Sequence, residues 1–233
     1  MEDALVMRPA TKADLNAITW IVKHGFPDDP GCTYKFPYRD EYPEDSWKWT
    51  RLEYEEYLSQ PEKFATLVVT APVASDGGVV HQPISIGVWD VAVETKSKGG
   101  DRGINKRKDA NPQHMRAYAA AVACGFEAHF AKYGNDQLNL SILVTHPDFR
   151  RRGAATMLCN WGQKKSVETG RVLTVMASPM GKPLYLSLGY ELVGSVIAQV
   201  DSEEEKVDID ILKKDVDADP AARSRMIQLA NLR

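Results

Sequence analysis

The chain has 233 residues, of which 43% are hydrophobic and 26% are charged, and this composition can fill one sizeable core. A formal net charge of −3 argues against a protein whose main role is to neutralise nucleic-acid phosphates, and no apolar run reaches the roughly 18 residues that a membrane helix needs. The N-terminus does not have the layout of a secretory signal, and three scattered cysteines form no CxxC pair for zinc or redox chemistry. We therefore expect a cytoplasmic globular protein without a metal site, a membrane contact or a nucleic-acid partner.

Strand and helix periodicities alternate along the chain. A capping box at residues 11–14 starts the first helix, and Gly25 with Pro27 ends it. The expected elements are, in order, a strand at 5–9, a helix at 11–25, a loop with short helical turns at 26–45, a helix at 46–58, strands at 64–70 and 84–93 around a turn at 76–78, a helix at 113–133, a strand at 137–145, a helix at 154–168, a strand at 172–177, a short helix from 183, and a hairpin of strands at 191–200 and 206–212. This order predicts an α/β (α+β) domain with a single sheet layered by helices.

Two segments interrupt the pattern. Residues 95–109 hold six basic residues, two acidic residues and three glycines with almost nothing apolar, so we expect an exposed loop. A nucleic-acid contact would need interleaved aromatic residues, which this loop lacks, so a solvated loop is the favoured interpretation. The chain ends in an acidic, alanine-rich tail with a helix expected after Pro220.

The most informative segment joins the strand at 137–145 to the next helix. It begins with His146, which we interpret as a turn-packing residue, and continues through three arginines to Gly153 and two alanines. Backbone N–H groups at a helix start lack internal partners and carry the positive end of the helix dipole. Small residues let an anion approach these groups, so the segment predicts a pyrophosphate site, with a solvated arginine cluster as the alternative. The spacing fits neither a Walker A loop nor the GxGxxG fingerprint.

Two motifs resemble those of one acyltransferase family. Arg150-x-x-Gly153-x-Ala155 resembles the Arg/Gln-x-x-Gly-x-Gly/Ala signature of the GNAT acyltransferases, and the Leu-Tyr-x-x-x-Gly-Tyr run at 184–190 resembles that family's Leu-Tyr-x-x-x-Gly-Phe block. The element order agrees over residues 5–212, and the Ala-Ser-Pro stretch before the second motif resembles a fungal branch. The resemblance implies a GNAT fold, with a central, mixed but mostly antiparallel sheet that splays at an acyl-CoA cleft and is flanked by helices. The implied division of the chain is a GNAT domain at 1–214, with an acceptor-side lid at 26–60 and a basic loop insertion at 95–111, and a tail at 215–233.

The resemblance also implies acetyl-CoA as the co-substrate. Its pyrophosphate is expected on the amides of residues 151–155, and its pantetheine arm on the backbone of residues 143–145, as an added strand. A backbone N–H near Leu143 would polarise the thioester carbonyl. The expected cofactor-binding residues are Leu143, Val144, Thr145, Arg150, Arg151, Arg152, Gly153, Ala154, Ala155, Thr156 and Ser178.

Tyr185 matches the position of the family's general acid, which protonates the departing CoA thiolate. A phenol with a reference pKa near 10 suits this step, and the alternative is a packed aromatic residue. The strand positions where some family members place a base hold Asn139 and Ser141, which favours proton loss through ordered water. Glu94 and Asp90 are the carboxylates expected to anchor that water.

Aromatic and acidic residues gather before the first long strands. Residues 34–57 contain eight of the chain's 20 aromatic residues, and residues 40–62 carry eight acids against two basic residues. Such a surface suits a cationic or arylalkyl amine through carboxylate attraction and cation–π contact, and the alternative is a solvated helix whose rings pack on the sheet. The residues expected to contact the acceptor are Tyr34, Phe36, Trp47 and Trp89.

We therefore expect an N-acetyltransferase that moves an acetyl group from acetyl-CoA to a primary amine of a small molecule in a ternary complex, as a monomer or homodimer. The alternatives are a protein or peptide N-acetyltransferase and a non-catalytic acyl-CoA-binding protein. A lid at 26–60 that seals the groove would favour the small acceptor, whereas an open groove would favour a peptide.

Overall fold

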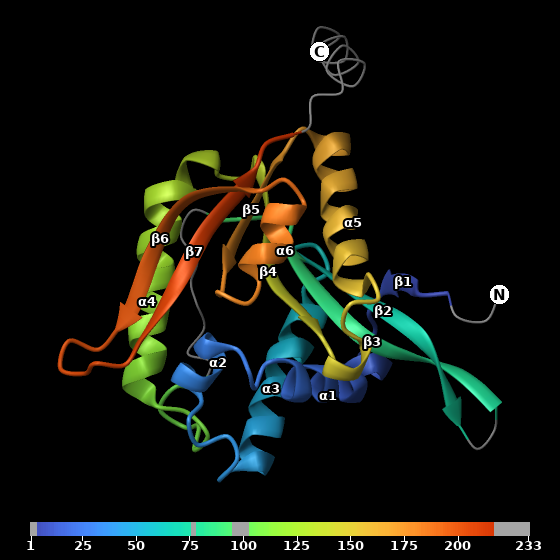
Figure 1. Cartoon of the computed structure of the whole chain (residues 1–233), viewed down its shortest axis with the longest axis horizontal. Helices are drawn as coiled ribbons and strands as arrows, with labels where there is room; N and C mark the ends of the chain where they lie inside the picture. The colour runs from blue at the N-terminus through green and yellow to red at the C-terminus, as the bar shows by residue number, and fades with distance from the viewer. Residues whose placement is uncertain (1–3, 76–77, 95–102, 217–233) are drawn as a thin grey trace, which may run out of the picture.

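The computed structural model describes residues 4–75, 78–94 and 103–216, and its strands form one seven-stranded sheet (Figure 1). The strand order is β1-β2-β3-β4-β5-β7-β6, and every pair is antiparallel except β4 with β5. The strands are β1 (Val6–Pro9), β2 (Phe64–Ser75), β3 (Gly78–Asp90), β4 (Gln137–Thr145), β5 (Val172–Ala177), β6 (Glu191–Gln199) and β7 (Lys206–Lys214). The expected single, mostly antiparallel sheet is confirmed.

Helices connect and cover the strands. The described α-helices are α1 (Leu15–Gly25), α2 (Pro30–Lys35), α3 (Pro43–Ser59), α4 (Pro112–His129), α5 (Ala154–Thr169) and α6 (Lys182–Ser187), with 3₁₀ turns at Lys12–Asp14, Ala131–Tyr133 and Pro147–Phe149. α3 begins three residues before the expected start at 46, because Pro43 fits a first helical turn and Glu44 and Asp45 complement the positive end of the helix dipole.

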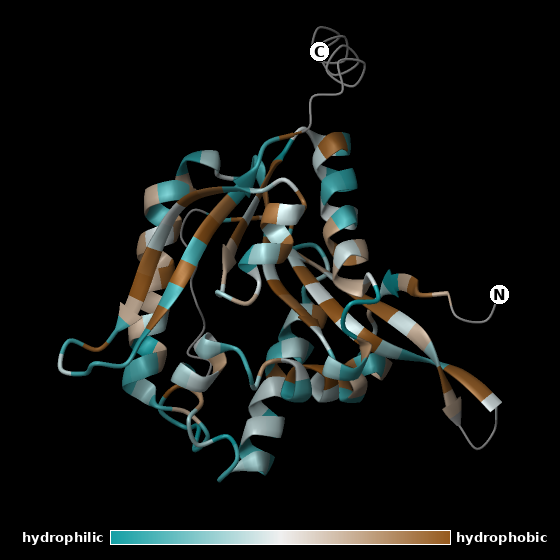
Figure 2. Ribbon diagram, in the orientation of Figure 1, coloured by the Kyte–Doolittle hydropathy of each residue, from teal (hydrophilic) through white to brown (hydrophobic). Residues whose placement is uncertain are grey.

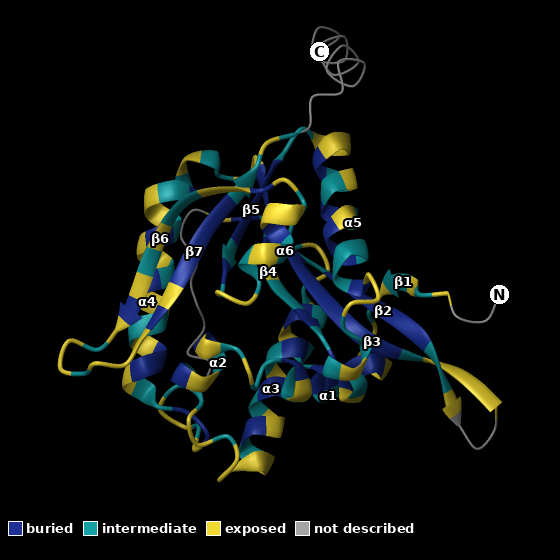
Figure 3. Cartoon of the chain, viewed as in Figure 1, coloured by how far each residue is buried: buried dark blue, intermediate teal, exposed yellow. Residues whose placement is uncertain are grey.

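The sheet has an apolar layer on each face, so the middle of β3 is buried at every position (Figure 3) and apolar residues recur along the strands (Figure 2). On β2, Leu67 and Val69 belong to a core with α5 and α6, whereas Val68 belongs to a core with α1 and α3. A smaller core joins α2 and α4 to β6 and β7. One face of the sheet is therefore covered by α5 and α6, and the other by the four remaining helices (Figure 1).

β4 changes face in its middle. It pairs with β3 in two registers, and Ser141 is the extra residue at which the register shifts. Leu140, before the shift, belongs to the core with α5, whereas Val144, after it, belongs to the core with α1. A strict alternation would have placed both residues on one face.

α5 approaches β3 closely at Gly162. A Cβ on Gly162 would lie 2.2 Å from the ring of Trp89, so a larger residue would push the helix away. Trp89 has no exposed surface, and its indole N–H donates to the carbonyl of Leu158 at 3.2 Å. The prediction that Trp89 contacts the acceptor is therefore corrected: the ring is part of the core between the sheet and α5.

The segment 103–111 packs on α2 and α3, which corrects the expectation of a solvated loop for this part of the insertion. Arg107 and Asp109 form a buried ion pair at 2.7 Å, with 5% and 0% of their side chains exposed. The backbone N–H of Lys108 donates to the carboxylate of Asp45 at 2.7 Å. Although this segment is basic in composition, its own buried carboxylate, that of Asp109, holds it in place.

We expect Asp109→Ala to lower the free energy of unfolding by about 3–5 kcal/mol, because the Arg107 guanidinium would stay buried without its carboxylate. Chemical denaturation with linear extrapolation measures this change. Glu168→Ala is the matched control, since it breaks the ion pair between Glu168 and Lys165, which has the same length of 2.7 Å. The side chains of Lys165 and Glu168 are 42% and 41% exposed, so this pair should contribute little to stability. A loss for Asp109→Ala as small as that of the control would contradict a structural role for the buried pair.

Three expectations lie outside the described residues: the centre of the turn between β2 and β3 at 76–77, the first part of the basic loop at 95–102, and the tail beyond 216 with its helix. Of the helices that the structure describes, none combines the length and the apolar character needed to cross a bilayer.

Candidate functional site

β4 and β5 pair along only four residues each, at 137–140 and 172–175. Polar side chains reinforce this ladder: the Thr174 hydroxyl donates to the Gln137 amide oxygen at 2.9 Å, and the Asn139 amide donates to the Thr174 hydroxyl at 3.1 Å. Past the ladder, β4 has no strand partner on this side within the described residues. Its backbone edge there is available to a ligand that pairs as an added strand.

The turn between β4 and α5 has the backbone geometry of an anion nest. Arg151 and Gly153 have positive φ values of 64° and 89°, and Arg151 is the only described residue other than glycine in this region. The N–H groups of residues 151–156 have no acceptor within the described part of the chain. A Cβ on Gly153 would meet no atom within 4 Å, so an anion can reach these N–H groups at the positive end of α5.

Tyr185 of α6 lies in the core shared with α5 and is 5% exposed. Burial raises the pKa of its phenol well above the ordinary value, and Cys159, Tyr190 and Asp29 raise it further. The hydroxyl therefore stays protonated at neutral pH.

Residues 106–201, which include the nest, the gap and Tyr185, match the family described as Acetyltransferase (GNAT) domain. These residues therefore carry the sequence pattern of a GNAT acetyltransferase domain. A protein named Acetyltransferase from the fungus Stachybotrys chartarum is 25% identical over 198 residues, which cover 82% of each chain.

Solved structures agree on the fold of the GNAT domain. An N-acetyltransferase from Staphylococcus aureus has a TM-score of 0.54 at 13% identity, over 91% of this chain and 99% of that one. A GNAT superfamily phosphinothricin acetyltransferase from Sinorhizobium meliloti, in complex with acetyl-CoA, has a TM-score of 0.53 at 15% identity, over 92% and 89%. The GNAT fold expected from the two motifs is confirmed.

The guanidinium of Arg150 is engaged within the GNAT domain. It donates to the carbonyl oxygens of Gly25 at 2.8 Å and Thr145 at 3.4 Å, which ties the nest to the end of α1. Arg152 donates to a backbone carbonyl at 3.2 Å. Arg151 is exposed, and the structure gives its side chain no ion pair among the described residues, so it is the arginine best able to meet an anion at the nest.

The other residues of the expected cofactor site follow one path through the GNAT domain. Leu143 and Thr145 are half-buried on the free part of β4, Val144 between them is buried, and the chain continues from there into the nest. Ser178 follows β5 across the gap, where its hydroxyl accepts the N–H of Gly181 at 3.4 Å. The path ends at residues 154–156, the first residues of α5.

The two expected carboxylates differ in their surroundings. Asp90 pairs with Asn139 across β3 and β4, two residues from Ser141. Burial raises the pKa of Asp90, although the backbone N–H of Ala92 opposes the shift. Glu94 is exposed. Asp90 is therefore the more buried of the two carboxylates and lies beside the paired part of β4.

Asn139 and Ser141 are occupied with each other, since the Ser141 hydroxyl donates to the Asn139 amide oxygen at 3.3 Å. His146 stacks on Trp20 at 3.8 Å, and its Nδ1 accepts the N–H of Asp148 at 3.3 Å, so the turn-packing interpretation is confirmed. Burial lowers the pKa of His146, which keeps the ring neutral.

The expected acceptor residues do not come together. Tyr34 is 1% exposed and stacks on His114 at 4.1 Å, so its expected contact with an acceptor is corrected to a core role. Phe36 is half-buried, and the guanidinium of Arg107 covers its ring at 4.3 Å. Trp47 alone of the four is exposed, at 37%, on α3.

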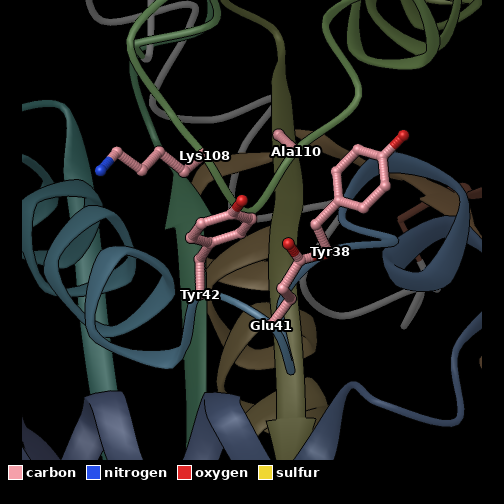
Figure 4. Close-up of a pocket in the computed structure, with 5 residues that line it drawn as sticks. All are labelled: Tyr38, Glu41, Tyr42, Lys108 and Ala110. Atoms are coloured by element: carbon pink, nitrogen blue, oxygen red, sulfur yellow. The ribbon is translucent and has the colours of Figure 1, made fainter.

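A shallow hollow of about 440 Å³ lies where the loop after α2 meets the segment 103–111 (Figure 4). Its lining residues are Tyr38, Glu41, Tyr42, Lys108 and Ala110. Figure 4 shows the tyrosine rings on either side of Glu41, with the ribbons of β3 and β4 behind them in this view. Sequence reasoning placed these two rings in the aromatic segment but did not select them, because burial of neighbouring rings such as Tyr34 cannot be read from composition.

Proposed function

We propose that the protein transfers the acetyl group of acetyl-CoA to a primary amine of a small molecule, by direct attack within a ternary complex. The observation that carries this proposal is the nest at 151–156, which opens beside the unpaired edge of β4. The acetyl-CoA complex of the Sinorhizobium meliloti relative supports the choice of cofactor.

Acetyl-CoA would use two backbone surfaces of this chain. The N–H groups at the start of α5 would hold the pyrophosphate, and the exposed Arg151 would add charge. The pantetheine arm would pair with the backbone of residues 143–145. A free N–H near Leu143 would donate to the thioester oxygen as negative charge develops on it.

In the proposed reaction the amine nitrogen attacks the thioester carbonyl carbon, and the carbon–sulfur bond breaks. The sulfur takes the phenol proton of Tyr185, which is available because burial keeps that phenol protonated. The proton lost by the amine passes to a water anchored by Asp90, and the phenol is reprotonated from solvent. Asn139 and Ser141 do not act as bases.

The acceptor would enter from the face of α2 and the segment 103–111. Tyr38 and Tyr42 are 45% and 36% exposed, and Glu41 stands between them, so the hollow offers aromatic surface and negative charge to an amine with an aromatic or apolar part. Its volume of about 440 Å³ is in the usual range for a small-molecule site.

We expect steady-state assays with acetyl-CoA to give a kcat/KM for arylalkyl amines at least about tenfold above that for N-terminal peptides, since tenfold corresponds to about 1.4 kcal/mol of binding energy in the transition state. Release of CoA thiol measures turnover. A preference for peptides would favour the protein acetyltransferase instead. Binding of acetyl-CoA without turnover of any amine would favour the non-catalytic alternative.

A further inference from the structure

His114 joins three elements that lie far apart in the sequence. It is in the first turn of α4 and is 4% exposed. Its Nδ1 is 2.8 Å from the carbonyl oxygen of Tyr34 in α2, and its Nε2 is 2.5 Å from Oε2 of Glu203 in the turn between β6 and β7. The imidazole also stacks on the ring of Tyr34, with 4.1 Å between centroids and 4° between planes.

Both partners of this imidazole are acceptors. A carbonyl oxygen can only accept, so Nδ1 carries a proton, and the carboxylate of Glu203 requires a second proton on Nε2. Glu205 adds a further carboxylate within 4.8 Å of the same atoms. Burial alone would lower the pKa of His114, but Glu203, the Tyr34 carbonyl and Glu205 together raise it above its ordinary value. The charged imidazolium is therefore the form that fits this site.

The same contacts lead to the hollow. Tyr38 follows α2, and its N–H donates to the carbonyl of Asp109 at 3.2 Å. Ala110 lies just before α4 and lines the hollow from the other side. The hydrogen bond between His114 and the Tyr34 carbonyl joins α4 to α2, the two elements next to the residues that line the hollow. The contact of His114 with Glu203 adds the turn between β6 and β7.

We propose that the imidazolium of His114 is a positioning group that holds α2, α4 and the turn at 200–205 together, and so keeps the acceptor-side hollow assembled. The part that concerns the acceptor rests on the proposed function. Raising the pH through the pKa of His114 removes one proton, leaves two acceptors facing each other in a buried place, and loosens these elements. The hollow is thus intact at low pH and weakened at high pH.

Glu203→Gln separates this proposal from a merely structural histidine. In this variant a neutral imidazole can keep its Nδ1 proton on the Tyr34 carbonyl while Nε2 accepts an N–H of the new side-chain amide, so no second proton is needed. Glu204→Gln, with the same charge change one residue away at an exposed position, is the matched control.

The first measurement is independent of activity. Because the folded pKa is raised, the stabilisation is complete below the unfolded value of about 6.5 and is lost as the pH rises through the folded value. We expect the Tm of the parent and of Glu204→Gln to fall relative to that of Glu203→Gln between about pH 6 and pH 9. NMR titration, with the His114 signal assigned by its loss in His114→Gln, should give a midpoint above that unfolded value. A midpoint at or below it, or parallel Tm profiles in all three proteins, would overturn the proposal.

The second measurement is the acceptor KM. The acceptor KM of the parent divided by that of Glu203→Gln should rise by about fivefold or more over the same pH range, which is the lower end of typical coupling between sites. The affinity for acetyl-CoA should stay equal in the two proteins. Protonation of the amine itself cancels in this ratio. A constant ratio would overturn the positioning role.

Two further outcomes are distinguishable. If no amine is acetylated, the proposed function fails, whereas the Tm profiles and the NMR titration still decide whether His114 clamps the three elements. The cluster of His114, Glu203 and Glu205 could also accept a divalent cation. A saturable rise in Tm with zinc chloride that is absent in Glu203→Gln would show a metal site and overturn the imidazolium clamp.

Discussion

Tyr185→Phe is expected to lower the single-turnover rate of acetyl transfer by about 10²–10⁴-fold, the usual contribution of a positioned general acid. The substitution keeps the ring, its packing in the core with α5 and nearly all of its buried area. The affinity for acetyl-CoA should change little, because that affinity would rest on the nest and on the backbone of β4. A fall in rate without a loss of binding identifies an interaction made in the transition state.

Tyr190→Phe provides a matched control for this experiment. The two rings lie 5.6 Å apart, and burial raises the pKa of both phenols, but the Tyr190 hydroxyl is buried without a hydrogen-bond partner among the described residues. Its removal should leave the rate almost unchanged. Burial raises the pKa of Tyr185 well above its ordinary value, so the phenol does not titrate near neutral pH. Removal of its hydroxyl should therefore lower the rate by the same factor across neutral pH and leave the shape of the pH profile unchanged. Rates for Tyr185→Phe within about twofold of the parent would show that the tyrosine is structural.

Gly153→Ala is expected to weaken acetyl-CoA binding by about 10- to 100-fold, equivalent to the loss of one charge-assisted hydrogen bond. At a φ of 89° an alanine is strained, and the backbone relaxes by turning the N–H groups of the nest away from the phosphates. Its Cβ would also occupy the open space through which the anion approaches. Isothermal titration measures the affinity, and the rise in Tm with saturating acetyl-CoA should shrink in parallel.

Gly134→Ala is the control for backbone strain. Gly134 also has a positive φ, at 49°, with no atom within 4 Å of a Cβ, but it follows α4 and is not part of the nest. Both variants should lose stability, and only Gly153→Ala should lose affinity. Equal affinities in a folded Gly153→Ala protein would place the phosphates elsewhere.

The features that sequence could predict are those whose chemistry is local. The nest depends on small residues, arginines and a helix start within seven positions, so its location follows from the chain around Gly153. Tyr185 could be selected because it stands at a fixed distance from that turn within a second motif. The element order was equally accessible, because strand and helix periodicities remain clear along most of the chain.

The features that sequence missed depend on tertiary packing. Aromatic residues look alike in composition, whereas the fold buries Tyr34 and Trp89 and leaves Tyr38 and Tyr42 exposed. The shift at Ser141 inserts one residue into an otherwise regular alternation, and only pairing with β3 reveals it. The packing of the segment 103–111 could not be predicted either, because its composition is mostly basic and polar. Only the structure shows that Asp109 is buried and paired with Arg107.

The four-residue ladder between β4 and β5 divides the molecule in a way that concerns its motions. Within the sheet, β1–β4 form one antiparallel set and β5–β7 another, and among the described residues the strands of the two sets pair only along this ladder. We expect the sheet to open locally along this junction, because only a short ladder of backbone hydrogen bonds crosses it. A cofactor that binds across the junction would hold the two sets of strands together. Without the cofactor, local opening would therefore occur along the same line at which the cofactor binds.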